Sequence, residues 1–244
     1  MAILVTRPAP DNEATAEALR KGGFEPLLAP MLVFQALPFQ IEDSRDFRGL
    51  ILTSTNALRA IASNPLPRLQ GLPAFAVGAR TAQAAREAGF RDVRTAEGDA
   101  TSLRELIIAS VPEKRGVAPL LYLSATDISR DLGGELGLRG VNIVAVPVYR
   151  MARLDDFTDA VRAAFARQAI EAVLHYSRRS ALAFIAATRR TGLEISALAL
   201  PQICLSETIA ATLRDAGADR PIVAKTPTEA DLLDALEQTV RRKG

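Results

Sequence analysis

The feature that most constrains this chain is an internal repeat whose two copies begin at different points. Three pairs of segments carry the repeat: 50–57 with 172–180, 76–89 with 204–217, and 121–124 with 3–6. In the third pair the order is changed, because the segment that comes last in one copy comes first in the other. The repeat is therefore a permuted duplication, which predicts two similar halves.

Short apolar stretches alternate with helical patterns along the whole chain. The stretch 49–53, for example, is apolar and is followed by Ser54 and a helical pattern. Gly89 and Gly217 end two of the expected helices, as glycine often does at a helix C-terminus. Strands that alternate with helices of this length need right-handed crossovers and form parallel sheets. The sequence predicts an α/β fold with two parallel sheets of about five strands each.

Two segments, 30–38 and 144–153, interrupt this alternation and read as paired extended linkers between the halves. Helices are expected on either side of the second linker, at 128–138 and 155–167. The expected domains are a discontinuous outer one, 1–34 with 154–244, and an inserted one, 38–145. Tyr149 lies on the second linker, so we expect it to face whatever the two halves enclose, unless its ring packs at the junction.

Composition limits the classes of function. The chain has 244 residues, of which 48% are hydrophobic and 24% charged, as in a globular protein of two domains. A net charge of +2 gives little support for nucleic-acid binding. No apolar run approaches the length of a membrane span and no signal peptide is recognisable, so we expect a cytoplasmic protein without a membrane partner. The single cysteine, Cys204, lies in an apolar run and is expected to pack rather than react.

Ligands of parallel α/β sheets bind beyond the carboxyl ends of the strands. The residues at those ends are mostly small or hydroxylated: Thr6, Thr53, Ser54, Gly78, Ser124, Ser177, Ser206 and Thr226. For any one of them, helix capping is the simpler interpretation. Together they would aim helix N-termini at one ligand that carries many carboxylates or phosphates. Arg7 and Arg178 could add charge-assisted contacts, or each could be a solvated surface residue.

Several common signatures are absent from the sequence. No G-x-G-x-x-G or Walker sequence follows an expected strand, so the fingerprints of dinucleotide and nucleoside triphosphate binding are missing. His175 is the only histidine and lies in an apolar strand, so a histidine-based triad or a metal site is not expected. A cofactor-free enzyme or a binding protein remains. Tyr149 is then the first catalytic candidate, as a phenol that could donate a proton to a departing oxygen, and Thr81 is a second candidate.

Six short motifs resemble those of the uroporphyrinogen-III synthase family. They are Thr-Ser-x-Asn-Ala at 53–57, Ala-Val-Gly-x-x-Thr-Ala at 76–82, Val-Pro-Val-Tyr-Arg at 146–150, Ser-x-Arg-Ser at 177–180, Cys-Leu-Ser-Glu-Thr at 204–208 and Pro-Thr-x-x-Asp-Leu at 227–232. The resemblance covers essentially the whole chain. It implies two flavodoxin-like domains joined by a two-stranded linker. It also implies a cofactor-free cyclisation of hydroxymethylbilane to uroporphyrinogen III, with loss of water and inversion of ring D.

The resemblance also implies roles for individual residues. Tyr149 matches a linker tyrosine thought to assist loss of the hydroxyl group, and Thr81 matches a threonine of the substrate cleft. The turns that would line the cleft hold Ser54, Ser124, Ser177, Ser206 and Thr226. Ile209 departs from the repeat, because it is apolar where the other half has Thr81.

The expected partners are hydroxymethylbilane and, transiently, the preceding enzyme of the pathway, and we expect a monomer. The alternative is a non-catalytic two-lobed binding protein or a carrier for a polyanionic small molecule.

Overall fold

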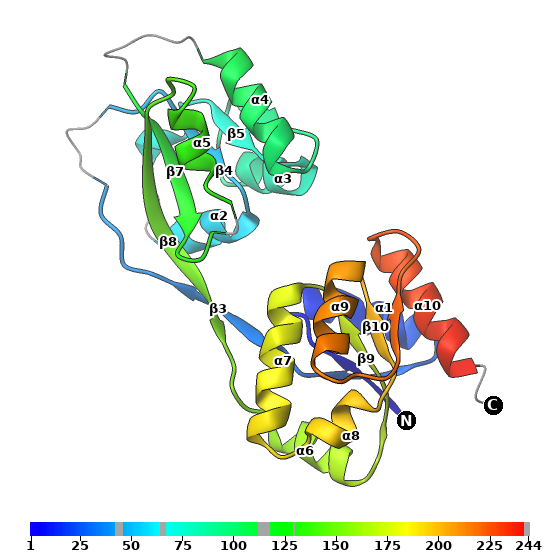
Figure 1. Cartoon of the computed structure of the whole chain (residues 1–244). Coiled ribbons are helices and arrows are strands. Elements are labelled where there is room, and N and C mark those ends of the chain that lie inside the picture. The colour runs from blue at the N-terminus through cyan, green and yellow to red at the C-terminus, as the bar shows by residue number, and fades with distance from the viewer. Residues whose placement is uncertain (42–45, 64–66, 112–117, 129, 242–244) are drawn as a thin grey trace. The chain divides into compact units, whose positions relative to one another are not determined.

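The computed structural model describes residues 1–41, 46–63, 67–111, 118–128 and 130–241 (Figure 1). The chain forms two compact units. Unit 1 comprises residues 1–33 and 152–244, and unit 2 comprises residues 34–151. Each unit is built around its own sheet.

Unit 1 contains a five-stranded parallel sheet in the order β11-β10-β9-β1-β2. Its strands are β1 (Ala2–Val5), β2 (Glu25–Leu28), β9 (Ile170–His175), β10 (Gln202–Cys204) and β11 (Pro221–Val223). Its helices are α1 (Asp11–Lys21), α6 (Asp159–Ala166), α7 (Arg178–Arg190), α8 (Glu194–Leu198), α9 (Glu207–Asp215) and α10 (Glu229–Arg241). Leu19 of α1 and Leu232 of α10 pack on one face of the sheet, while α7 and α9 lie together on the other (Figure 1).

Unit 2 contains a six-stranded sheet in the order β3-β8-β7-β4-β5-β6. Its strands are β3 (Leu32–Ala36), β4 (Gly49–Leu52), β5 (Ala74–Ala76), β6 (Val93–Thr95), β7 (Leu120–Ala125) and β8 (Ile143–Arg153). Its helices are α2 (Thr55–Ile61), the 3-10 helix η1 (Pro67–Leu69), α3 (Ala79–Glu87), α4 (Ala100–Ser110) and α5 (Leu132–Gly137). Alternate residues of β4 face opposite sides: Leu50 packs with α2 and α3, and Ile51 packs with α4 and α5.

The order of the strands accounts for the permuted repeat. The series β11-β10-β9-β1-β2 of unit 1 matches β6-β5-β4-β7-β8 of unit 2, with β3 added beside β8. The strand pairs that match are those whose sequences resemble one another, such as β9 with β4 and β1 with β7. The predicted fold of two parallel α/β sheets related by a permuted repeat is confirmed.

The two expected linker segments pair with each other. The N–H of Leu37 donates to the carbonyl of Val148 at 2.9 Å, and the N–H of Leu154 donates to the carbonyl of Met31 at 3.0 Å. Residue numbers rise along one segment as they fall along the other, so the segments run antiparallel. This pairing forms the two-stranded linker that was predicted.

Helices α5 and α6 are shorter than predicted, because a capping side chain begins each of them after the predicted start. The helix expected at 128–138 begins at Leu132, where an Asp131 side-chain oxygen accepts from the N–H of Gly134; residue 129 of that range lies outside the described residues. The helix expected at 155–167 spans Asp159–Ala166, because Thr158 caps it. The short helix α8 was not predicted, and its first turn has no side-chain cap.

Candidate functional site

Four of the predicted site residues lie at one edge of the sheet in unit 2. Thr53 and Ser54 follow β4, Gly78 follows β5, and Ser124 lies near the end of β7. These three strands are neighbours in the order β7-β4-β5 and run parallel, so their carboxyl ends meet at this edge. The Thr53 hydroxyl lies 3.2 Å from the phenol oxygen of Tyr122. The edge therefore presents several hydroxyl groups together.

Helices α2 and α3 begin at this edge. Ser54 caps α2, and its hydroxyl oxygen accepts from the N–H of Asn56 at 3.1 Å. Gly78 begins α3, and a Cβ atom there would lie 3.1 Å from the Cα of Gly98, so the turns after β5 and β6 touch. Thr81, in the first turn of α3, is 5% exposed, and its hydroxyl makes no hydrogen bond to the part of the chain that is described. The start of α3 thus combines a close glycine turn with an unengaged hydroxyl.

Tyr149 lies beside the end of β7, in line with the same edge. It pairs with Ala125 after a shift in the β7–β8 register, and its carbonyl accepts from the N–H of Thr126 at 3.0 Å. The side chain is 6% exposed and belongs to the hydrophobic core of unit 2. Its ring stacks on Phe34, with centroids 5.9 Å apart and planes inclined by 27°. Tyr149 is thus both a packed aromatic residue and a neighbour of the strand ends.

The predicted residues of unit 1 also lie at the carboxyl ends of their strands. Ser177 caps α7, and its oxygen accepts from the N–H of Ser180 at 3.1 Å. Ser206 begins α9 but forms no capping bond through its side chain. The hydroxyl of Thr226, after β11, donates to the Asp231 carboxylate. Arg178 is exposed in the first turn of α7, and none of the described residues bonds to its guanidinium.

Arg7 is engaged within unit 1 rather than left open. Its guanidinium forms ion pairs with Asp11 and Glu229, each at 3.2 Å, and lies over the ring of Tyr176 at 4.5 Å. One Glu229 carboxylate oxygen also accepts from the hydroxyl of Thr15 at 2.5 Å and from Tyr176 at 3.1 Å. Burial raises the pKa of the Tyr176 phenol, so it stays protonated and donates to the carboxylate. No sequence pattern indicated this network, because Arg7 and Glu229 are 222 residues apart.

The single histidine and the single cysteine are buried in unit 1. The Nε2 atom of His175 lies 2.8 Å from the side-chain oxygen of Gln202, and its Nδ1 atom has no partner among the described atoms. Burial lowers the pKa of His175 to about 4, so the ring is neutral at pH 7. Burial raises the pKa of the Cys204 thiol to about 12, so it is not a nucleophile at that pH. Both residues are packed inside the protein, as expected.

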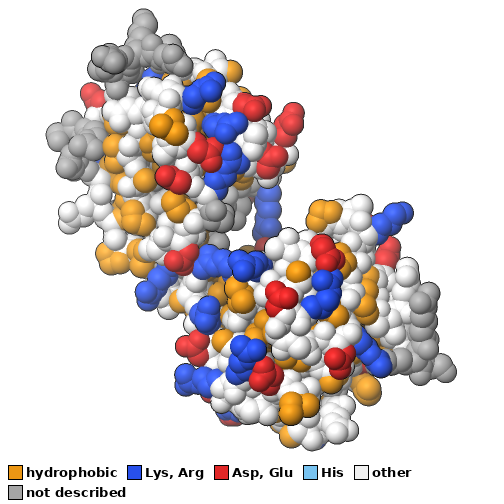
Figure 2. All heavy atoms as spheres, in the orientation of Figure 1, with side chains coloured by type: hydrophobic (Ala, Val, Ile, Leu, Met, Phe, Trp, Pro, Cys, Tyr) orange, Lys and Arg blue, Asp and Glu red, His pale blue; other side chains and the backbone are white. Residues whose placement is uncertain are grey.

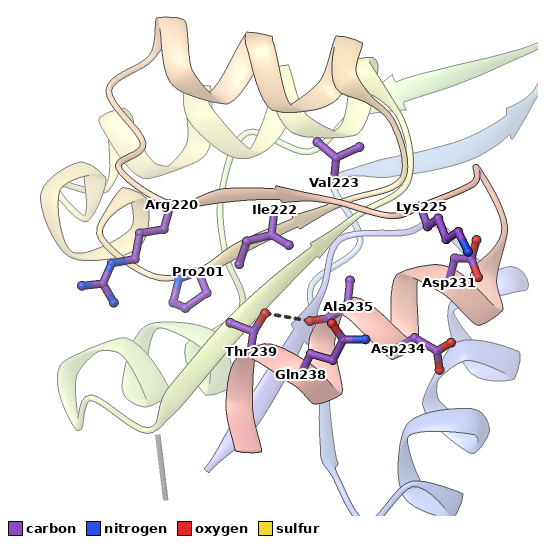
Figure 3. Close-up of a pocket in the computed structure, with 10 residues that line it drawn as sticks. All are labelled: Pro201, Arg220, Ile222, Val223, Lys225, Asp231, Asp234, Ala235, Gln238 and Thr239. Carbon is purple, nitrogen blue, oxygen red and sulfur yellow. Dashed lines mark hydrogen bonds between the residues drawn. The ribbon is translucent and has the colours of Figure 1, made fainter. Parts of the chain in front are cut away.

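A separate pocket of about 550 Å³ opens at the free edge of the unit 1 sheet, between β11 and α10 (Figure 3). It is lined by Pro201, Arg220, Ile222, Val223, Lys225, Asp231, Asp234, Ala235, Gln238 and Thr239. Lys225 and Asp231 point toward one another at its rim (Figure 3). The lining contains none of the predicted site residues. The strand-end residues therefore remain the candidate site.

Three further observations concern surface charge, metal binding and membrane-spanning helices. On the face shown in Figure 2, basic and acidic side chains are interspersed over each unit. Among the residues that the structure describes, no group of three or more His, Cys, Asp or Glu side chains is placed to hold a metal ion. The helices in the same described ranges are all too short or too polar to cross a membrane.

The fold and these strand ends define a class of protein: a two-domain α/β protein in which small and hydroxylated residues begin the helices at the carboxyl edge of each sheet. The family model described as uroporphyrinogen-III synthase HemD matches residues 13–234. The chain therefore belongs to the uroporphyrinogen-III synthase family, as its motifs predicted. Members of this family are cyclising lyases of haem biosynthesis.

Two solved structures have a similar fold. Uroporphyrinogen-III synthetase from Helicobacter pylori is 20% identical, with a TM-score of 0.67, and the match covers 97% of this chain and 98% of that one. A mutant uroporphyrinogen III synthase from the extremely thermophilic bacterium Thermus thermophilus is 17% identical, with a TM-score of 0.59 and coverage of 99% of both chains. No curated protein sequence matches the chain significantly. At these identities the two structures support the fold.

Proposed function

We propose that this protein is a uroporphyrinogen-III synthase that converts hydroxymethylbilane to uroporphyrinogen III. The observation that carries the proposal is the family match over residues 13–234, which includes most of both units. In the reaction the terminal C–O bond of the substrate breaks and the hydroxyl leaves as water. A carbon of ring D then attacks the electrophilic methylene that remains, which gives a spiro intermediate. Rearrangement of this intermediate closes the macrocycle with ring D inverted.

The substrate is bound through its carboxylates at the carboxyl ends of the strands. Helix N-termini carry free N–H groups and the positive end of the helix dipole, so they favour carboxylates. Thr81, the second catalytic candidate, is also proposed to contact the substrate. The binding residues in this proposal are Arg7, Thr53, Ser54, Gly78, Ser124, Ser177, Arg178, Ser206 and Thr226. Support is strongest for Thr81, Arg178 and Ser206, whose side chains form no bond with the described residues. Arg7 would bind a substrate carboxylate only by giving up its ion pair with Asp11 or Glu229.

Tyr149 is the proposed catalytic residue. Its phenol donates a proton to the departing hydroxyl, which then leaves as water rather than hydroxide, and the phenolate takes back the proton that ring D loses when the macrocycle closes. A phenol is a weak acid, and the electron-rich pyrrole beside the breaking bond supplies most of the driving force. The harder task is to direct which carbon of ring D attacks. Orientation of the substrate therefore contributes more to the outcome than strong acid or base catalysis.

The decisive experiment incubates the protein with freshly made hydroxymethylbilane and resolves uroporphyrinogen isomers I and III. A synthase gives isomer III, whereas a carrier of polyanions, the alternative function, leaves the spontaneous isomer I. Tyr149→Phe is expected to lower kcat by roughly 10²-fold, as loss of a general acid commonly does. Tyr176→Phe serves as the matched control because it also removes one phenol hydroxyl; Tyr176 contacts Arg7, so any effect of this variant is expected on KM and stability rather than on kcat. A wild-type rate for Tyr149→Phe would remove Tyr149 from the mechanism.

We further propose that the protein acts as a monomer in the cytoplasm and receives its substrate from the preceding enzyme of the pathway. Charged residues of both signs make up 24% of the chain, which supports a freely dissolved protein. Light scattering coupled to size-exclusion chromatography would test the monomer, for which the expected mass is 26.1 kDa. A mass of twice that value would contradict it.

A further inference from the structure

The ring of Tyr149 rests on an aromatic neighbour that comes from the other linker segment. Phe34 of β3 stacks on it with a centroid distance of 5.9 Å and an interplanar angle of 27°. The two residues are 115 positions apart in the sequence but belong to the same unit. Phe34 is half-buried, whereas Tyr149 is buried. The contact thus lies at the margin of the unit 2 core rather than at its centre.

The backbone on both sides of this contact is fixed by hydrogen bonds. The Nε atom of Arg150 donates to the side-chain oxygen of Gln35 at 2.7 Å, and the N–H of Leu37 donates to Val148 at 2.9 Å. The carbonyl of Tyr149 is held by the N–H of Thr126 at 3.0 Å. The main chain of Tyr149 is therefore well anchored. The stacked ring of Phe34 is one of the contacts that set the direction of its phenol group.

Arg59 contacts Phe34 in turn. It lies in the last turn of α2, and its guanidinium carbon is 4.3 Å from the centroid of the Phe34 ring. A guanidinium above an aromatic face is attracted by the negative face of the ring. Within the described parts of the chain, Arg59 forms no ion pair or hydrogen bond. Its contact with Phe34 therefore accounts for its position.

We propose that Phe34 is a positioning residue for Tyr149 and that Arg59 holds Phe34 in place. This inference rests on the proposed role of Tyr149 as the proton donor. Arg59 limits the movement of the Phe34 ring, and Phe34 limits rotation of the Tyr149 side chain about its Cα–Cβ bond, which is the rotation that would move the phenol oxygen. The phenol is then held in one direction before substrate binds. Preorganisation of this kind matters because a shift of about 1 Å in a reacting group can slow a reaction by roughly 10²-fold.

A double-mutant cycle tests the proposal by the turnover of hydroxymethylbilane. Phe34→Leu is expected to lower kcat about 5- to 10-fold with little change in KM, since it removes the flat ring but keeps apolar volume. Phe34→Tyr, which retains the ring, is expected to restore a rate within about twofold of wild type. In the Tyr149→Phe background, Phe34→Leu is expected to lower kcat less than about twofold, because its effect acts through the phenol. Equal effects of Phe34→Leu in both backgrounds would overturn the inference.

Arg59→Gln gives a second cycle that does not depend on the folding of the Phe34 variants, because Arg59 is on the surface. It is expected to lower kcat about two- to threefold in the wild-type background and not at all with Tyr149→Phe. Arg86→Gln is the matched control, since Arg86 lies in the last turn of α3 in the same unit. Failure of wild type to form isomer III would refute the proposed function. If wild type forms isomer III but Phe34→Leu and Arg59→Gln lower kcat equally with and without the Tyr149 phenol, only this inference would be refuted.

Discussion

Glu229 is the residue whose replacement is expected to destabilise unit 1 most selectively. One of its carboxylate oxygens accepts from Thr15, Tyr176 and Arg7, at 2.5, 3.1 and 3.2 Å. These residues join the starts of α1 and α10 to the ends of β1 and β9. Glu229→Leu removes all three interactions at once. Arg7 keeps its ion pair with Asp11, so no charge is left buried without a partner.

The magnitude follows from the exposure of the partners. The side chains of Arg7 and Glu229 are 20% and 38% exposed, so their ion pair contributes about 0.5–1 kcal/mol. The hydrogen bonds from Thr15 and Tyr176 contribute about 1 kcal/mol each. Glu229→Leu is therefore expected to lower the free energy of unfolding by about 2–3 kcal/mol. Glu229→Gln keeps an acceptor oxygen for the two hydroxyls, so it is expected to cost about 1 kcal/mol.

Urea titration followed by far-UV circular dichroism measures these changes, because the chain has no tryptophan for fluorescence. If the units unfold in separate transitions, only the one assigned to unit 1 should move, and unit 2 serves as an internal control. Glu17→Gln is the matched surface control on α1, where Glu17 is exposed. The reasoning would be refuted if Glu229→Leu and Glu17→Gln had the same free energy of unfolding.

Three further predictions concern unit 1. The folded-state pKa of His175, about 4, is below its unfolded value of 6.5, so the stability from this neutral ring is complete above pH 6.5. This stability falls by up to about 3 kcal/mol as the pH drops toward 4. In His175→Gln the urea midpoint should therefore depend less on pH between 6.5 and 5 than it does in the wild type. Cys204, with a pKa of about 12, should react with a thiol reagent at pH 8 only after unfolding; rapid labelling of the native protein would contradict its burial. Ser177→Ala should lower the free energy of unfolding by about 1 kcal/mol in urea titrations, because it removes a helix-capping hydrogen bond. Ser206→Ala should leave stability nearly unchanged, because Ser206 makes no capping bond, and should raise KM if Ser206 binds substrate.

The architecture could be predicted because its signals are local and occur twice. Each strand is a short apolar run that ends at a small or hydroxylated residue, and the same runs recur in a permuted order. The burial of His175 and Cys204 followed from the same apolar runs. Helix boundaries were less accurate where a nearby polar residue could serve as the cap. Asp131 and Thr158 began their helices after the predicted starts, because the sequence does not show which capping residue is used.

By itself, the sequence determined the two parallel sheets, the permuted repeat and the edge at which the helices begin. Only the tertiary structure decided which side chains meet at that edge. It joined Arg7 to Glu229 and stacked Phe34 on Tyr149, although each pair is more than a hundred residues apart. The physical reason is that hydrophobic periodicity specifies which face of an element is buried, whereas the partner of a charge or an aromatic ring depends on how the strands are ordered in the sheet.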